Sequence, residues 1–411
     1  MCNTRLCIGL VAGVLTLSVS AWAETPASTQ GPTVGLDLMV DGAVGLRGGA
    51  GRGESLHGQA LAFIEGSVEA GADAQRLAYH GSVLGLLGRG PTGKFLGDFL
   101  TVSNSEGFES ARLYSWWAEL SRERWSLRAG ALLADEEFLG TEAGGALINA
   151  SFGWPAFVSS NTVNTGPAFF AAAPGLRLAL TPTPAVSWQI GVYDGDSFDS
   201  ADGNPEVNRD GLHLSVGGDQ GYFLISQVAF APEGQAWRGY AGGWWHTGDF
   251  ADLLLDRAGV AHFVSGQDPR LHAGHGGVFA AIERTWGGET GSPGTVDGHL
   301  RVGASPENRS AIAWAADVAF AWRGPFPSRP DDVLAVGMTH ARFSDDFAAA
   351  TRLETPDEPE PDYEHVLEVS YTWTLSDRLT LQPDVQWARH PGGSAAQRDS
   401  LVVLLRLSAS Y

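Results

Sequence analysis

Beyond its first ten residues the sequence contains no cysteine, because Cys2 and Cys7 are the only two. The rest of the chain therefore cannot form a disulfide bond or hold a metal ion through sulfur. Its stability must come from hydrogen bonds and packing.

Basic residues are also scarce, with 26 Lys and Arg against 47 Asp and Glu and a net charge of -21. Such a chain repels phosphate backbones, which excludes nucleic acids as partners. With 54 glycines, 14 tryptophans and 44% hydrophobic residues, it is too apolar and too aromatic to be disordered.

Long apolar runs are absent after the N-terminus, where Arg5 precedes the run from Leu6 to Ala21. The triplet Ala21-Trp22-Ala23 completes the layout of a secretory signal, and we expect cleavage after Ala23. A retained anchor helix is the less favoured alternative, since a span needs about 20 residues. No linker divides the remainder, so we predict a signal peptide at 1–23 and one domain at 24–411.

What the sequence does have is hydrophobic alternation with a period of two, in segments of about ten residues separated by Gly, Pro, Asp and Asn. Near the start, Val34, Leu36, Leu38 and Val40 alternate with polar or small residues. Near the end one face carries Leu379, Leu381, Val385 and Trp387, and the other carries Thr380, Gln382, Asp384 and Gln386. The pattern predicts an all-β protein.

A soluble β-sandwich also alternates, but the export signal and the lack of disulfides favour a membrane barrel. Only a closed barrel pairs every backbone group of a sheet within hydrocarbon. Aromatic residues near the predicted strand ends are typical of interfacial girdles: Trp125, Tyr371, Trp373, Trp387 and Tyr411. A terminal aromatic strand, here ending at Tyr411, is the usual signal for the barrel assembly machinery. We therefore predict a single transmembrane antiparallel β-barrel in the bacterial outer membrane.

The predicted connections are either short or long, and this difference predicts which barrel end faces the periplasm and which faces the outside of the cell. Ser121 to Arg124 and Ser376-Asp377 would be short periplasmic turns. Asp194 to Asp210, Thr247 to Gly274 and Ser344 to Asp362 would be long extracellular loops. At about 24 residues per strand and loop, the chain holds on the order of 16 strands, enough to leave an aqueous channel.

Several short blocks are specific: Arg112-Leu113-Tyr114, Trp116-Trp117, Asn149 to Pro155, Ala172 to Arg177, Arg329 to Asp332, Gln382 to Trp387 and Pro391 to Gly393. With these blocks the chain resembles the OprB-type carbohydrate-selective outer-membrane porins over most of residues 100–411. The resemblance implies a 16-stranded barrel through which glucose and other mono- and small oligosaccharides diffuse passively. Phe169-Phe170-Ala171 replaces a usual Tyr-Pro pair and Tyr411 a usual Phe, so the preferred sugar stays open.

Alternation also selects candidate pore-lining residues, because selectivity in a channel depends on the lining chemistry. With Ser121 to Arg124 as the turn, Trp117 would lie roughly opposite Arg128, with Glu119 diagonal to it. Further inward candidates on later strands are Arg177, Glu364, Glu368, Gln382, Asp384, Gln386 and Arg406. Each could instead be a plain wall charge, and Gln382, Asp384 and Gln386 could brace a loop folded into the pore.

Signals for catalysis and metal binding are weak. His272 and His275 have no carboxylate near them in the sequence, and no nucleophile elbow or H-E-x-x-H motif occurs. We therefore expect no enzymatic activity, metal or cofactor. A general diffusion porin and a plugged structural or enzymatic barrel remain the alternatives. The expected partners are sugars, outer-membrane lipid and lipopolysaccharide, the barrel assembly machinery, and further copies in a homo-oligomer.

Overall fold

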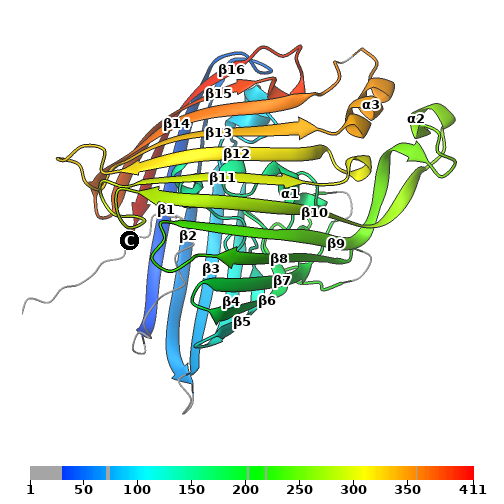
Figure 1. Cartoon of the computed structure of the whole chain (residues 1–411). Helices are drawn as coiled ribbons and strands as arrows, with labels where there is room; N and C mark the ends of the chain where they lie inside the picture. The colour runs from blue at the N-terminus through cyan, green and yellow to red at the C-terminus, as the bar shows by residue number, and fades with distance from the viewer. Residues whose placement is uncertain (1–29, 71–74, 201–202, 218–219, 358) are drawn as a thin grey trace, which may run out of the picture.

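The computed structural model describes residues 30–70, 75–200, 203–217, 220–357 and 359–411. In these residues sixteen strands form one closed antiparallel barrel, in which sequence neighbours pair and β1 pairs with β16 (Figure 1). The predicted fold class and strand number are confirmed; the expected signal peptide lies outside the described residues. The strands are β1 (Gln30–Arg47), β2 (Gly53–Ala70), β3 (Gln75–Gly88), β4 (Ser110–Arg122), β5 (Trp125–Leu132), β6 (Ala173–Thr183), β7 (Val186–Asp194), β8 (Tyr222–Phe230), β9 (Trp237–Asp256), β10 (Pro269–Trp286), β11 (Val296–Ala304), β12 (Ile312–Arg323), β13 (Val333–Phe343), β14 (Tyr363–Ser376), β15 (Leu379–Arg389) and β16 (Ser400–Ser410).

Helical segments are short and lie in the connections between strands. They are α1 (Ala156–Ser159), α2 (His262–Ser265), α3 (Asp345–Glu354) and the single turns η1 (Thr92–Leu96), η2 (Gly144–Ala146), η3 (Ala150–Phe152), η4 (Val163–Thr165), η6 (Glu307–Arg309) and η7 (Pro391–Gly393). No helix in the described part of the chain is long and apolar enough to cross a membrane.

The seam between β1 and β16 closes the barrel at its last residue. The Leu36 amide donates to the Tyr411 carbonyl at 3.1 Å, and the Tyr411 amide donates to the Leu36 carbonyl at 3.0 Å. The two ends of the described chain therefore lie side by side.

Each strand turns its apolar residues outward, as the alternation predicts. On β16, Val403, Leu405 and Leu407 are exposed, whereas Leu404 and Arg406 are buried inside. An apolar outer surface suits contact with lipid, and the ladders leave no sheet edge in the hydrocarbon.

The two barrel ends differ as expected. One end has turns of two residues, at 123–124, 184–185 and 377–378, while the other has the long connections 89–109, 133–172 and 195–221. The expectation for Thr247 to Gly274 is wrong, since β9 and β10 continue as a paired ribbon and only 257–268 connects them. The ribbon extends beyond the lipid-facing part, where apolar alternation is not required.

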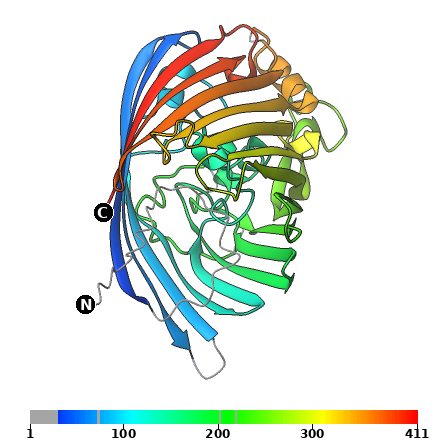
Figure 2. The same ribbon diagram turned by 60° about the vertical axis from the view of Figure 1, so that its left-hand side comes forward.

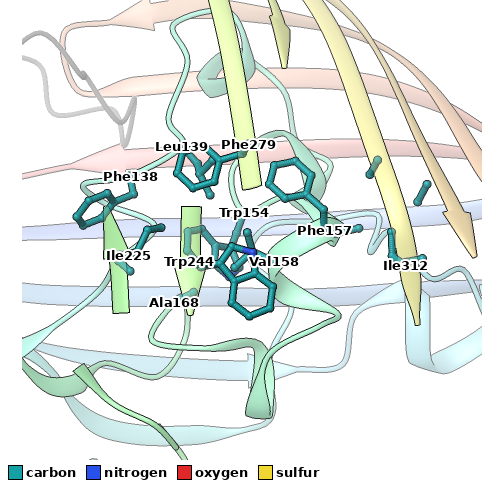
Figure 3. Close-up of a cluster of buried hydrophobic side chains, with 14 of the residues drawn as sticks. Phe138, Leu139, Trp154, Phe157, Val158, Ala168, Ile225, Trp244, Phe279 and Ile312 are labelled. Atoms are coloured by element: carbon teal, nitrogen blue, oxygen red, sulfur yellow. The ribbon is translucent and has the colours of Figure 1, made fainter. Parts of the chain in front are cut away.

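The connections 89–109 and 133–172 fold into the barrel instead of covering its mouth (Figure 2). Their buried side chains form a hydrophobic core inside the barrel. Phe138, Trp154 and Phe157 of the 133–172 segment pack against the inward side chains of Trp244 and Phe279 (Figure 3). Burial of these rings stabilises the segment against the wall, because each buried aromatic ring removes a large apolar area from water.

Glycines on the inner wall make room for these rings. A Cβ at Gly303 of β11 would lie 2.3 Å from the Phe157 ring, and a Cβ at Gly337 of β13 would lie 2.3 Å from Leu147 and 2.6 Å from Phe152. The in-folded segment can therefore approach the wall closely only where the wall has no side chain.

We expect Gly303→Ala to displace Phe157 and to weaken the docking of the 133–172 segment by about 1–3 kcal/mol, the usual cost of an extra methyl group in a packed core. The measurement is single-channel conductance in planar bilayers, which should rise and become noisier. Gly81→Ala is the control, since its Cβ would meet Ile64 at an ordinary 3.8 Å. Equal conductance of the two variants would contradict this prediction.

Candidate functional site

The first feature of the lumen is an ionic cluster on β4, β5 and β6. Arg128 donates from Nε to Glu119 at 2.9 Å and from Nη1 to Glu137 at 2.8 Å. Arg177 pairs with the same two carboxylates. Two guanidinium groups and two carboxylates thus hold one another in fixed positions, as charge-assisted hydrogen bonds of good geometry do.

The register within this cluster differs from the sequence prediction. Glu119 lies directly opposite Arg128, and Trp117 lies opposite Gly130. The turn contains only Glu123 and Arg124, whereas a four-residue turn from Ser121 to Arg124 was expected. The register between β4 and β5 therefore shifts by two residues from the predicted one. The three predicted residues are nevertheless neighbours.

An aromatic stack continues from Arg128 along the wall. The Arg128 guanidinium carbon lies 3.8 Å from the Trp117 ring centroid. Trp117 stacks on His80 at 5.4 Å with an interplanar angle of 15°, and His80 stacks on Phe63 at 6.2 Å. Because the faces of the inner rings are covered, the stack presents ring edges and polar atoms to the lumen.

A second ionic network lies on β9 to β12. Arg238 binds Glu283 at 2.9 Å, Arg323 binds Asp297 at 3.2 Å, and Glu142 lies 3.8 and 3.6 Å from the two guanidinium groups. Glu137 and Glu142 belong to the same in-folded segment, so residues 137–142 link the two networks. The lumen wall along this path carries nearly balanced charge.

Arg301 of β11 anchors that segment, and the sequence analysis did not single it out. Its guanidinium is fully buried and binds Asp317 at 3.0 Å, while it also donates to the carbonyls of Ser151 at 3.0 Å and Phe152 at 2.9 Å. Arg301 faces inward between the exposed Leu300 and Val302, an alternation that could have identified it.

The predicted residues on β14 face inward, but in-folded connections cover them. Glu364 accepts hydrogen bonds from the amides of Phe99 at 2.7 Å and Leu100 at 2.9 Å. Glu368 accepts from the amides of Ile148 at 2.5 Å and Asn149 at 3.0 Å. Both carboxyl groups are fully buried. They hold loop backbone and have no surface left for a permeant.

The predicted residues on β15 and β16 also face inward and are covered, wholly or in part. Gln382 donates to the Ala146 carbonyl at 3.1 Å, and Gln386 donates to the Val102 carbonyl at 2.9 Å and to Asp384 at 3.1 Å. Arg406 forms a buried pair with Asp41 at 2.7 Å. Gln382 and Gln386 thus contact in-folded loops, in agreement with the alternative of bracing a loop, whereas Asp384 contacts Gln386 and Arg406 is a buried wall charge.

Two buried carboxyl groups share one hydroxyl in the connection 89–109. Thr92 Oγ1 lies 3.2 Å from Asp98 and 2.9 Å from Glu106. One hydroxyl proton serves only one carboxylate, which favours a proton on the other group. Burial raises the pKa of Asp98 to about 6, and burial together with the nearby Asp98 raises the pKa of Glu106 to about 8.

Because the pKa of Glu106 is raised, the folded loop holds a proton that the unfolded loop releases, and its stability falls as pH rises from about 4.5 towards 8. We expect hydrogen-exchange protection of the Val102 and Ser103 amides, corrected for intrinsic rates, to fall at least about tenfold between pH 5 and pH 8, the equivalent of one pKa unit.

Glu106→Gln should weaken this response above pH 6, because it removes a group whose pKa is raised to about 8. Glu109→Gln, an exposed position of the same connection, is the matched control and should keep the response. Protection that stays constant or rises with pH in the unsubstituted protein would show the assignment to be wrong.

Known porins resemble this chain both in sequence and in fold. The model of the "Carbohydrate-selective porin, OprB family" matches residues 72–411. Porin B of Pseudomonas aeruginosa is 21% identical over 257 residues, which is 57% of this chain and 54% of that protein. The chain thus aligns with about half the length of this curated relative.

Solved structures share the barrel. The high-pH structure of Pseudomonas putida OprB superposes with a TM-score of 0.80 at 18% identity, covering 93% of this chain and 94% of that one. The outer-membrane channel DcaP of Acinetobacter baumannii gives a TM-score of 0.54 at 11% identity, covering 95% and 99%. At these identities the likeness concerns the fold, while the family match rests on sequence across most of the chain. The chain belongs to the OprB family of carbohydrate-selective porins and is an outer-membrane β-barrel.

Proposed function

We propose that the barrel lets glucose and other small neutral sugars diffuse passively across the outer membrane, with Trp117, Glu119 and Arg128 as the sugar contact. Glu137 and the buried Arg177 hold this contact in place. The observation that carries the proposal is the arrangement around Arg128. Its guanidinium lies over Trp117 while Glu119 and Glu137 fix its two sides. Donors, acceptors and an apolar ring edge are therefore presented together at one level.

Charge balance supports a neutral permeant. Arg128 and Arg177 are matched by Glu119 and Glu137, and Arg301 is matched by Asp317. A wall whose charges are paired does not concentrate ions of one sign, but its hydrogen-bonding atoms can still replace the water around a sugar hydroxyl.

Family membership also argues against the alternatives. Porins of this family are channels, so a plugged or enzymatic barrel would depart from the family. The decisive experiment reconstitutes the protein in liposomes and compares the permeation of glucose, a larger oligosaccharide and small ions. Glucose flux that exceeds the flux of similarly sized non-sugar solutes supports the proposal. Flux that depends on size alone would identify a general diffusion porin.

Arg128→Gln tests the contact directly. We expect glucose to block the ion current at least about tenfold less strongly, because one hydrogen bond from a charged donor contributes roughly 1.5–3 kcal/mol. The measurement is the glucose concentration that halves the open-channel current in planar bilayers.

Arg323→Gln is the matched control for Arg128→Gln. Its side chain is 18% exposed, as is that of Arg128, and it lies between two carboxylates, Asp297 and Glu142. No aromatic ring of the described residues lies under Arg323. An equal loss of glucose block in both variants would show that lumen charge, and not this contact, determines binding.

A further inference from the structure

Figure 1 shows the barrel end that carries α3, next to β13 and β14. At this end the residues of β13, β14 and β15 whose register continues the exposed apolar rows are polar. His340, His365 and Arg389 are direct register partners and form one row across the three strands. Towards the middle of the barrel the next row is Met338, Leu367 and Trp387, of which Met338 and Leu367 are exposed and apolar. The polar row therefore marks the level at which the outer surface changes from apolar to polar.

The nitrogen atoms of this row have no hydrogen-bond or ion-pair partner among the residues that the structure describes. Arg389 is exposed, and its guanidinium lies 6.0 Å from the Tyr363 ring centroid. Within the described residues it makes no hydrogen bond or ion pair, and the same holds for His340 and His365, which make ring contacts with each other at 5.8 Å. The neighbouring Arg342, by contrast, pairs with Asp345 and Asp362.

Aromatic rings surround the row on three sides. Trp314 lies 5.0 Å from His340, Tyr363 lies 5.2 Å from His340, and Trp387 lies 6.2 Å from His365. Tryptophan and tyrosine concentrate where acyl chains meet headgroups, because their rings are apolar and their N–H or O–H groups are polar. The row thus lies at headgroup level.

At the same end β1, β2 and β3 expose Leu46, Leu56 and Leu87, and the exposed Arg47 of β1 has Leu401 and not a histidine as its register partner. The net charge of -21 would repel anionic lipids from most of the surface. An unpaired arginine with two imidazoles at headgroup level is therefore a place where a lipid phosphate meets complementary charge and hydrogen-bond donors.

We propose that His340, His365 and Arg389 bind the phosphate of a phosphorylated lipid headgroup in the outer leaflet, with Trp387 and Tyr363 against the adjoining part of the lipid. Arg389 supplies the positive charge, and the two imidazoles supply N–H donors. The site is on the outer surface and is independent of the sugar path.

The test titrates the detergent-solubilised full-length barrel with diphosphoryl lipid A and with its phosphate-free derivative, and counts bound lipid by native mass spectrometry. We expect the diphosphoryl form to bind more tightly. Arg389→Gln should weaken it about fivefold, the usual effect of one cation at a membrane surface. The double variant His340→Phe/His365→Phe, which keeps the rings and removes the N–H donors, should also weaken it.

Arg284→Gln is the matched control, because Arg284 is likewise exposed, lies 5.7 Å from the Trp286 ring centroid, and belongs to the opposite barrel end. It should leave the affinity unchanged. Equal binding of the phosphate-free lipid, or an equal loss in Arg284→Gln, would overturn the proposal. Complete displacement of lipid by millimolar inorganic phosphate would also overturn it, since the site would then recognise a free anion. Heat-modifiable electrophoretic mobility verifies that every variant is folded.

Discussion

The arrangement inside this barrel depends on one constraint: irregular backbone taken away from water must find hydrogen-bond partners. The turns and short helices of the connections 89–109 and 133–172 satisfy part of their backbone, and the wall supplies further partners as buried charges. Glu364 and Glu368 accept from loop amides, and Arg301 donates to loop carbonyls. The loop in turn places Glu137 against Arg128 and Arg177. The sugar contact that we propose therefore rests on residues that no sugar touches.

Much of the fold could be predicted from the sequence, because alternation with a period of two is a direct consequence of strand geometry and of lipid outside the barrel. The outward Leu405 and the inward Arg406 follow from it, as does the inward orientation of Glu119 and Arg128. The prediction of a loop from 247 to 274 was wrong, because a strand that extends into water needs no apolar face and so shows no alternation. In the structure β9 continues to Asp256.

The candidate site was harder to predict. The groups that pair with its wall residues lie in loops, whose sequences show no periodicity. Glu137 carries no pattern that would place it beside Arg177, and Glu364 binds an amide 265 residues away in the chain. Alternation says that a side chain faces inward, but not whether a loop covers it. Trp117 and Arg128 stay accessible from the lumen, whereas Glu368 does not.

The seam between Leu36 and Tyr411 has a consequence for how the protein is made. Because these residues exchange both backbone hydrogen bonds, the ring of strands cannot be completed until the final strand has been synthesised and exported. Every shorter intermediate has two open sheet edges, each able to pair with another chain. Closure of the barrel therefore requires the complete chain, and until then both edge strands need protection from pairing with other chains.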